Sequence, residues 1–448
     1  MTSQTKIPKK KRKVQSQDLA FNDSNLALYY LPELMWGLGM PMSQRNALSQ
    51  LFYDRFLLYF TSSGENEDIQ NRMTWLHRLP DMSTDGTNNA LSLALYAAAS
   101  AFSGMKTRNL ALVQDACNVY GKALQLHGKV IQQRGKKGKI TAHMVSTSVL
   151  LSIFEAMNAT SSEAYRGHVC GAARMVQLVG PDQCMFGVMC QLYFHIRTQM
   201  AFVYLTTRKE DRSETVPAEQ ILRENLEYRK IPIFQRLVTF ITRLSEQYIE
   251  LEDGAGENGA TKQILDLEVF LEVKDGVDAL WQEFALAAEE KGQRLQWQNE
   301  QGDTMYRNPF TALCIAFFAA AHILFAMLAP RLAVSYPDFT DYYQKILEVA
   351  AFLRAFRIGC AYMRMAAPLY LVGLHAPQQQ QRTTAIVYFD EWRKMGMGGI
   401  SALALESIER RKDQMAVRGG GRVEEARFPT LDLCVKTSVL ESFAERVQ

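Results

Sequence analysis

Seven cysteines carry the most distinctive chemistry of this chain, because a thiolate can bind a metal ion or form a disulfide. Structural zinc sites usually take thiolates from C-x2-C pairs, since each sulfur must reach the metal at about 2.3 Å. Here the two nearest cysteines are Cys184 and Cys190, none precedes Cys117, and no C-x2-C occurs. We therefore expect structural cysteines in a reducing compartment, with no metal site and no disulfide scaffold.

The histidines form no recognisable catalytic pattern. His168 and His322 lie in segments of helical pattern, and neither H-E-x-x-H nor G-x-S-x-G occurs. A lone helical histidine more often packs or forms a hydrogen bond than catalyses. No combination of nucleophile, base and orienting group is apparent. The sequence thus predicts no catalytic residues, and a small-molecule hydrolase or transferase is a weaker alternative.

Two glycine-rich stretches could contact phosphate groups. Residues Gly254 to Gly259 read G-x-G-x-x-G, but a helical stripe precedes them where a dinucleotide site requires a strand. Residues 134–139, RGKKGK, lack the Walker pattern and suit a solvated loop that an anionic partner could use. We expect no bound cofactor at either stretch.

The stretch 160–181 contains both ends of an amphipathic helix. Thr160 and Glu163 have capping-box spacing, and Gly180 with Pro181 is a typical helix end, with the glycine in the left-handed conformation. Five apolar residues between these ends recur at helical spacing: Tyr165, Val169, Ala172, Val176 and Val179. Polar residues fall on other faces, so this helix should pack on one side: Arg166, His168, Arg174 and Gln177.

Similar patterns predict an all-α body over residues 18–410, followed by a flexible tail over 411–448. One stripe joins Leu48, Leu51, Phe52, Phe56 and Tyr59, and another joins Leu110, Val113, Cys117, Tyr120, Leu124 and His127. Only residues 385–389, AIVYF, resemble a strand, inside a helical context. Expected linkers are 62–69, 134–139, 207–218, 253–260 and 299–309.

Residues 310–329 contain no charge and are long enough to span a membrane. His322 near the middle opposes that interpretation, because an isolated imidazole in hydrocarbon is costly. A helix buried on all sides within an all-α core explains the same pattern, so we expect no membrane span.

Residues 1–17 carry six cations and no acid, which leaves the rest of the chain at −3. We expect a disordered tail, and an acidic body suits a nucleic-acid backbone poorly. One run is identical to the nuclear localisation signal of a polyomavirus large tumour antigen: Pro8, Lys9, Lys10, Lys11, Arg12, Lys13 and Val14. That identity predicts a nuclear protein that binds an import receptor. It leaves open whether the signal is native, and a generic basic arm is the alternative.

The order of motifs resembles the middle homology region of fungal binuclear zinc-cluster transcription factors, across roughly residues 25–410. The family's central helix has an aromatic residue, a histidine, Gly-Ala and a closing Gly-Pro. Here those places hold Tyr165, His168, Gly171, Ala172, Gly180 and Pro181. The segments YDRFLLYF, ALSLALYAAASAF, NPFTALCIAFFAAAHILF and MRMAAPLYLVGLHAPQQQQR are also similar to it, in the same order. The resemblance implies a large, multi-helix regulatory region.

Family members bind DNA through a six-cysteine cluster that these 448 residues lack. The resemblance therefore implies a nuclear regulator that acts through a partner zinc-cluster factor or corepressor, with no specific DNA binding of its own. A truncated form of a sequence-specific zinc-cluster factor for RNA polymerase II genes is the alternative. Twenty methionines could line a cavity for a small-molecule effector, of the kind that regulates some family members, although ordinary core packing also explains them.

Overall fold

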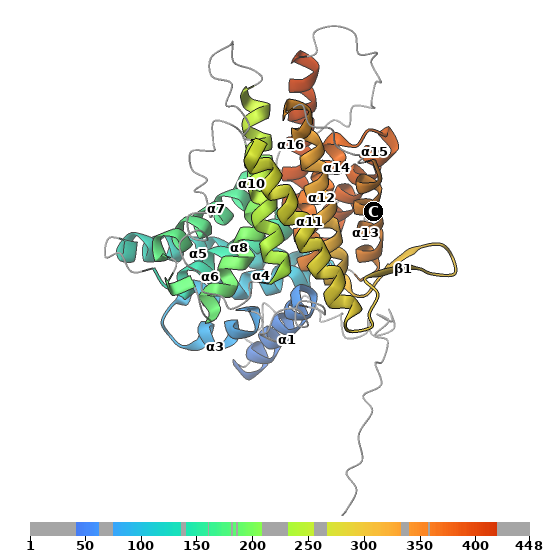
Figure 1. The fold of residues 1–448 in the computed structure, drawn as a ribbon. Helices are drawn as coiled ribbons and strands as arrows, with labels where there is room; N and C mark the ends of the chain where they lie inside the picture. The colour runs from blue at the N-terminus through green and yellow to red at the C-terminus, as the bar shows by residue number, and fades with distance from the viewer. Residues whose placement is uncertain are drawn as a thin grey trace, which may run out of the picture.

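The computed structural model describes residues 42–61, 75–135, 140–159, 161–180, 182–184, 187–207, 232–254, 267–332, 340–356 and 359–418. The expected tail at 1–17, with its nuclear signal, lies outside these ranges, as does most of the expected C-terminal tail. Within them the chain forms fourteen α-helices and one short hairpin, so the predicted all-α class is confirmed (Figure 1).

The first half of the body is organised around one alanine-rich helix that packs against α1, α3, α5 and α6. That helix, α4, is capped by Asn88, whose side chain accepts hydrogen bonds from the backbone amides of Ala90 and Leu91. The helices of this half are α1 (Met42–Thr61), α3 (Leu79–Thr84), α4 (Asn89–Thr107), α5 (Leu110–Gly135), α6 (Ala142–Asn158), α7 (Ser162–Val179) and α8 (Gly187–Thr206). Short 3-10 turns lie at Trp75–Arg78 and Asp182–Cys184.

The second half surrounds α12, which packs against α10, α11, α13 and α14. In Figure 1, α10 to α14 and α16 stand roughly upright beside α5 to α8. The helices of this half are α10 (Ile233–Gly254), α11 (Leu267–Glu289), α12 (Pro309–Leu328), α13 (Thr340–Phe356), α14 (Gly359–His375), α15 (Gln379–Met395) and α16 (Gly398–Arg418), with a 3-10 turn at Ala329–Leu332. Both α14 and α16 also pack against α8, which joins the two halves.

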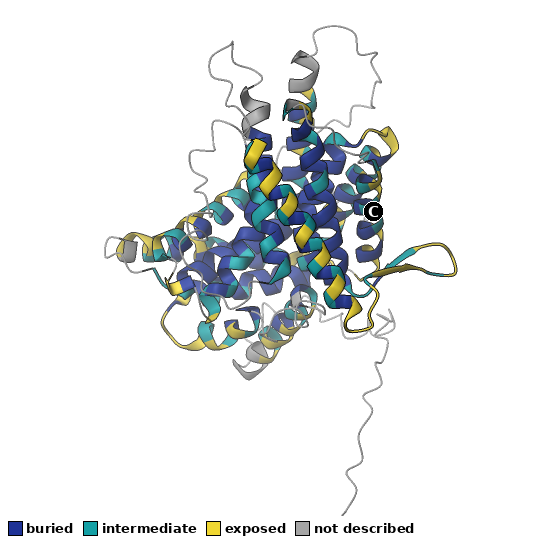
Figure 2. Cartoon of the chain, viewed as in Figure 1, coloured by how far each residue is buried: buried dark blue, intermediate teal, exposed yellow. Residues whose placement is uncertain are grey.

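Helix α12 is the buried centre of the second half. It is the one helix among the described residues that is long and apolar enough to cross a membrane, and 89% of that window is buried inside the protein. Asn308 caps its first turn, and its side chain accepts a hydrogen bond of 2.8 Å from the amide of Thr311. Burial on every side is what we expected of a core helix (Figure 2).

One local prediction was wrong, and one ambiguous segment follows its helical context. Residues expected as the linker 299–309 include the turn and second strand of a hairpin, in which β1 (Gln296–Gln298) pairs antiparallel with β2 (Thr304–Tyr306). The Asn299 side chain holds the turn by accepting from the amides of Gln301 and Asp303, a local geometry that apolar periodicity does not report. The strand-like residues 385–389 lie inside α15, with Ala385 and Phe389 buried and Val387 exposed, which is helical spacing.

Two predicted stripes were partly wrong. Leu51, Leu110 and Leu124 are exposed. In α5 the predicted Tyr120 and His127 are buried, together with Leu112, Ala116 and Ala123, which the predicted stripe left out. The stripe was predicted from the most hydrophobic residues, which are leucines. In the structure, small alanines permit the close packing of α5 on α4. Helix α16 continues to Arg418, beyond the domain boundary expected at 410.

Candidate functional site

Helix α7, the predicted central helix, packs against α6, α8 and α16. Its cap is Ser161, whose hydroxyl accepts a hydrogen bond of 3.0 Å from the amide of Ala164. The predicted Thr160–Glu163 capping box was wrong, because Ser161 takes the capping position and the Glu163 carboxylate pairs with Arg166. Three hydroxyl residues in a row, Thr160 to Ser162, made the cap ambiguous from sequence.

The predicted apolar stripe of α7 is confirmed. Tyr165, Val169, Ala172 and Val176 are buried, and Val179 is half-buried. The Tyr165 hydroxyl donates a hydrogen bond of 2.7 Å to the side-chain oxygen of Gln199 on α8. Burial raises the pKa of Tyr165, so the phenol stays neutral and anchors α7 to α8 through a polar contact within the core.

His168 lies at the edge of this stripe and reaches α5. Its Nε2 lies 2.9 Å from the Tyr120 hydroxyl, and the Tyr120 ring stacks on Phe154 of α6 at 4.3 Å between centroids. Burial lowers the pKa of His168, while the nearby Glu155 carboxylate opposes that shift. Burial also raises the pKa of Tyr120, and a hydrogen bond to Glu155 adds to the increase. A neutral imidazole and a neutral phenol thus join α7 to α5 across α6.

A second histidine, which is fully buried, extends this polar group along α5. His127 Nε2 lies 2.8 Å from the Ser148 hydroxyl on α6. Burial, followed by the charge of His168, lowers the pKa of His127 to about 4. Glu155, Tyr120, His168 and His127 therefore form a largely buried polar group, which we call the α5–α7 polar cluster. His168 was singled out as a candidate residue from the sequence. Its place beside Tyr120 and Glu155 was not predicted, because these residues belong to two other helices.

The other residues of the family motif lie in different environments. Ala172 is buried, whereas Gly171 is exposed and a Cβ there would meet no atom within 4 Å. Gly180 has φ +83°, which favours glycine, but its ψ of 167° is not the left-handed helical value that we expected. Its amide still closes the helix by donating to the carbonyls of Val176 and Gln177. Pro181 lies outside the described residues.

The remaining candidates show no shared site among the described residues. Six cysteines there form no disulfide, and no group of described histidine, cysteine or acidic residues has metal-binding geometry. His322 stacks on the Tyr342 ring at 4.5 Å, and burial lowers its pKa. Residues 255–259 of the G-x-G-x-x-G stretch and 136–139 of the basic loop lie outside the described ranges.

Sequence reasoning missed a polar contact at the junction of the two halves. Tyr248 of α10 lies 2.6 Å from His375 Nε2 of α14, and Arg411 of α16 donates to the Tyr248 hydroxyl and to the Leu205 carbonyl. Burial, followed by the charge of Arg411, lowers the pKa of His375 to about 3. These residues are far apart in sequence, so no local motif indicates them.

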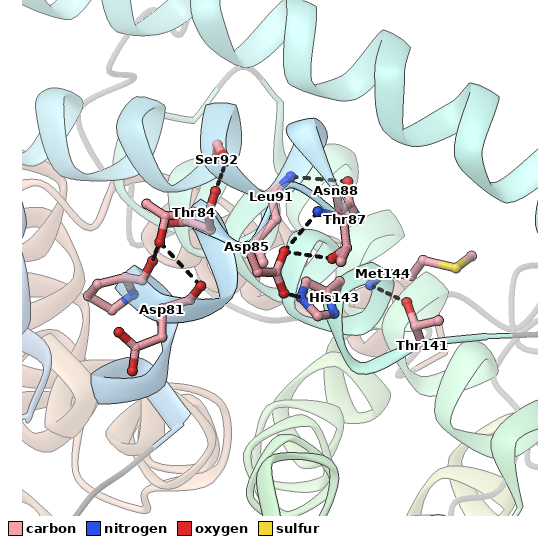
Figure 3. A network of polar contacts seen from close by, with 12 residues as sticks. Asp81, Thr84, Asp85, Thr87, Asn88, Leu91, Ser92, Thr141, His143 and Met144 are labelled. Carbon is pink, nitrogen blue, oxygen red and sulfur yellow. Dashed lines mark hydrogen bonds and ion pairs between the residues drawn. The ribbon is translucent and has the colours of Figure 1, made fainter.

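A third network joins the start of α4 to the start of α6 (Figure 3). The Asp85 carboxylate accepts from the amide and hydroxyl of Thr87 and lies 2.8 Å from His143 Nε2. The amide of Thr87, followed by its hydroxyl, lowers the pKa of Asp85. Asn88 and Thr141 cap α4 and α6 next to this network. The network therefore connects the N-terminal ends of the two helices and has a structural role.

No family model, no curated protein and no solved structure matches this chain. The family resemblance and the roles that it implies therefore stay predictions.

Proposed function

We propose that this chain is a nuclear transcriptional regulator whose helical body is a middle homology region and whose contact with specific DNA sites depends on a partner. The observation that carries the proposal is the order of family-like motifs along residues 25–410, centred on the helix 160–181. An all-α body is the architecture that the resemblance requires. The import-signal identity at Pro8 to Val14 supports the nuclear location.

The proposal that DNA contact depends on a partner rests on the residue composition of the chain. No C-x2-C pair occurs in the 448 residues, and the chain outside residues 1–17 has a formal charge of −3. An acidic body without a zinc cluster has neither the phosphate affinity nor the recognition element that specific DNA binding needs. A zinc-cluster protein or a corepressor bound to the helical body is therefore the proposed route to promoters.

Affinity capture from nuclear extract tests this function. The tagged full chain should recover a zinc-cluster transcription factor or a corepressor. A matched chain carrying Val176→Asp, which disrupts the buried face of α7, should lose that protein. Recovery of neither class by the intact chain would contradict the proposal.

The second candidate is a truncated form of an ordinary zinc-cluster activator. A basic segment commonly follows the cluster in that family, and Pro8 to Val14 could be the remnant of one. An in-frame six-cysteine block in the DNA upstream of Met1 would favour this candidate. A small-molecule effector that binds between the helices is compatible with either candidate.

A further inference from the structure

Helix α15 begins without a side-chain cap, although the first turn of a helix leaves backbone amides that need acceptors. Its N-cap is Gln378, whose side chain makes no capping hydrogen bond. Gln378, Gln379 and Gln380 are exposed, so this end of α15 faces solvent. Such an end attracts anions, because its amides and the helix dipole both favour negative charge. Water also satisfies free amides, so a binding site needs further groups around this end.

Gln381, the third residue of α15, supplies one such group. The residue is 5% exposed, and its Oε1 has no hydrogen-bond partner in the described part of the chain. Helical side chains tilt towards the helix N-terminus, so this amide is aimed back at the uncapped turn. The two ends of a glutamine amide exchange by rotation, so the buried end can present an oxygen or an NH2 group. Buried polar groups are normally satisfied, which indicates a partner at this end of α15.

Arg382 brings a positive charge to the same end of the helix. Its guanidinium folds back past the first turn and donates to the Ala376 carbonyl and, at 3.3 Å, to the Pro377 carbonyl. It also donates two hydrogen bonds, of 3.1 and 2.7 Å, to the side-chain oxygen of Gln379. These contacts hold a cation beside backbone amides that already form the positive end of the helix dipole.

Helices α15 and α16 form an antiparallel pair, which brings the late part of α16 to the start of α15. The Ser401 hydroxyl, near the start of α16, donates to the Phe389 carbonyl of α15. A Cβ at Gly373 of α14 would lie 2.9 Å from Ile408 and 3.7 Å from Ala385, so these two residues lie at one level. One turn further along this pair, the residue four positions after Ile408 lies beside the first turn of α15.

That residue is Lys412, which adds a second cation. It is half-buried and forms no ion pair with a described residue. Burial, followed by the charge of Arg382, lowers the pKa of Lys412, while the exposed Glu409 carboxylate opposes the shift. Two like charges thus lie near each other and near the positive end of a helix. This arrangement is unfavourable until an anion joins them.

The charge at this end of α15 selects the kind of anion. A phosphate group carries about −1.5 to −2 charges near neutral pH, whereas a carboxylate carries only one. Two cations and a helix N-terminus match the larger charge better. Phosphate also has several oxygens, which can accept from an ammonium, a guanidinium and backbone amides at the same time.

We propose that the start of α15 binds a phosphate group, as the free ion or as part of a small molecule. The site comprises one helix start and three side chains: the amides of Gln379 and Gln380 with Gln381, Arg382 and Lys412. A bound phosphate would join the first turn of α15 to the last part of α16. The site goes beyond the proposed function and does not depend on it.

Calorimetric titration of the full chain with inorganic phosphate, at fixed ionic strength, tests the site. Saturable binding is expected. Lys412→Gln and Gln381→Met should each weaken it about fivefold, the size of one partly buried charged contact. Lys394→Gln is the matched control, because Lys394 is exposed in the last turn of the same helix and should leave the affinity unchanged. Arg382 stays intact because it also bonds to the connection from α14.

Thermal unfolding separates lost binding from lost folding. Without phosphate, Lys412→Gln should unfold at nearly the same temperature as the intact chain, since a lysine without an ion pair contributes little to stability. Competition by glycerol phosphate would extend the site to phosphate monoesters, and its absence would restrict the site to the free ion. No saturable binding would assign the start of α15 to solvent and overturn the proposal. Equal affinities of Lys412→Gln and Lys394→Gln would overturn it too, since phosphate would then respond only to net charge.

Discussion

Helices α12 and α7 have similar lengths but opposite relations to the rest of the protein. Helix α12 carries no charged residue and is buried on all sides, including three consecutive alanines, Ala319 to Ala321. Helix α7 buries one stripe, and its other positions carry arginines, a glutamate and exposed glycines. Helix α12 thus contributes its whole surface to the core, whereas helix α7 keeps one side exposed.

The polar groups of the two helices differ in the same way. In α12, His322 stacks on Tyr342 and no charged side chain accompanies it on the helix. In α7, Tyr165 and His168 form hydrogen bonds to α8 and α5. Buried polar contacts fix the register of neighbouring helices because each one has a single partner. Hydrogen-bonded pairs of side chains therefore set the position of α7 against α5 and α8, whereas apolar packing sets the position of α12.

The largest expected effect is in α12. Ala319→Asp, Ala320→Asp and Ala321→Asp should each cost about 4 kcal/mol or more, because every one places a carboxylate in the core without a partner. Chemical denaturation of the three variants measures the loss. Tolerance of any one of these neighbouring positions would mean that α12 has a solvated side, and the contrast with α7 would fail.

In α7 the loss of stability caused by an introduced aspartate should depend on its position along the helix. Val176→Asp places a carboxylate on the buried stripe and should cost about 3–5 kcal/mol, whereas Gln177→Asp, the next residue, should cost under about 1 kcal/mol. Thermal unfolding compares the two variants. Equal losses would refute the assignment of the buried face.

Acidification should destabilise the protein through its buried histidines. Burial lowers the pKa of His127 to about 4 and also lowers that of His168, whereas both titrate near 6.5 when unfolded. The unfolded chain binds more protons between these values, so stability should fall as the pH drops from about 6.5 towards 4. Each such histidine contributes a slope of up to about 1.4 kcal/mol per pH unit.

Replacement of one histidine isolates its share of that slope. His127→Gln should reduce the dependence of the unfolding free energy on pH in this window. The control is His143→Gln, because His143 is partly exposed and pairs with Asp85 on the surface. An unchanged slope in His127→Gln would show that this imidazole does not titrate on unfolding.

The smallest effect expected is at the link between α5 and α7. Tyr120→Phe keeps the ring on Phe154 but removes the hydroxyl that contacts His168, so it should cost about 1–2 kcal/mol. A double-mutant cycle with His168→Ala should give a coupling of about 1 kcal/mol. Additive losses would mean that the contact contributes nothing to holding the two helices together.

The parts of the fold that sequence predicts well are those set by local pattern. The α7 stripe and the charge-free α12 follow from side chains a few residues apart, and both were confirmed. The hairpin at 296–306 and the cap at Ser161 depend on single turn residues and were missed. The contacts Tyr120–His168 and Tyr248–His375 join residues 48 and 127 positions apart, which periodicity cannot report.

The proposed function requires that this chain has no sequence-specific affinity for DNA of its own. Titration of purified full chain against duplex DNA, with and without inverted CGG triplets, tests it most directly. The six cations of residues 6–13 should give weak binding that falls steeply with salt, shows no preference for the triplets, and disappears when residues 1–17 are deleted. Salt-resistant, sequence-specific binding by the chain alone would contradict the claim.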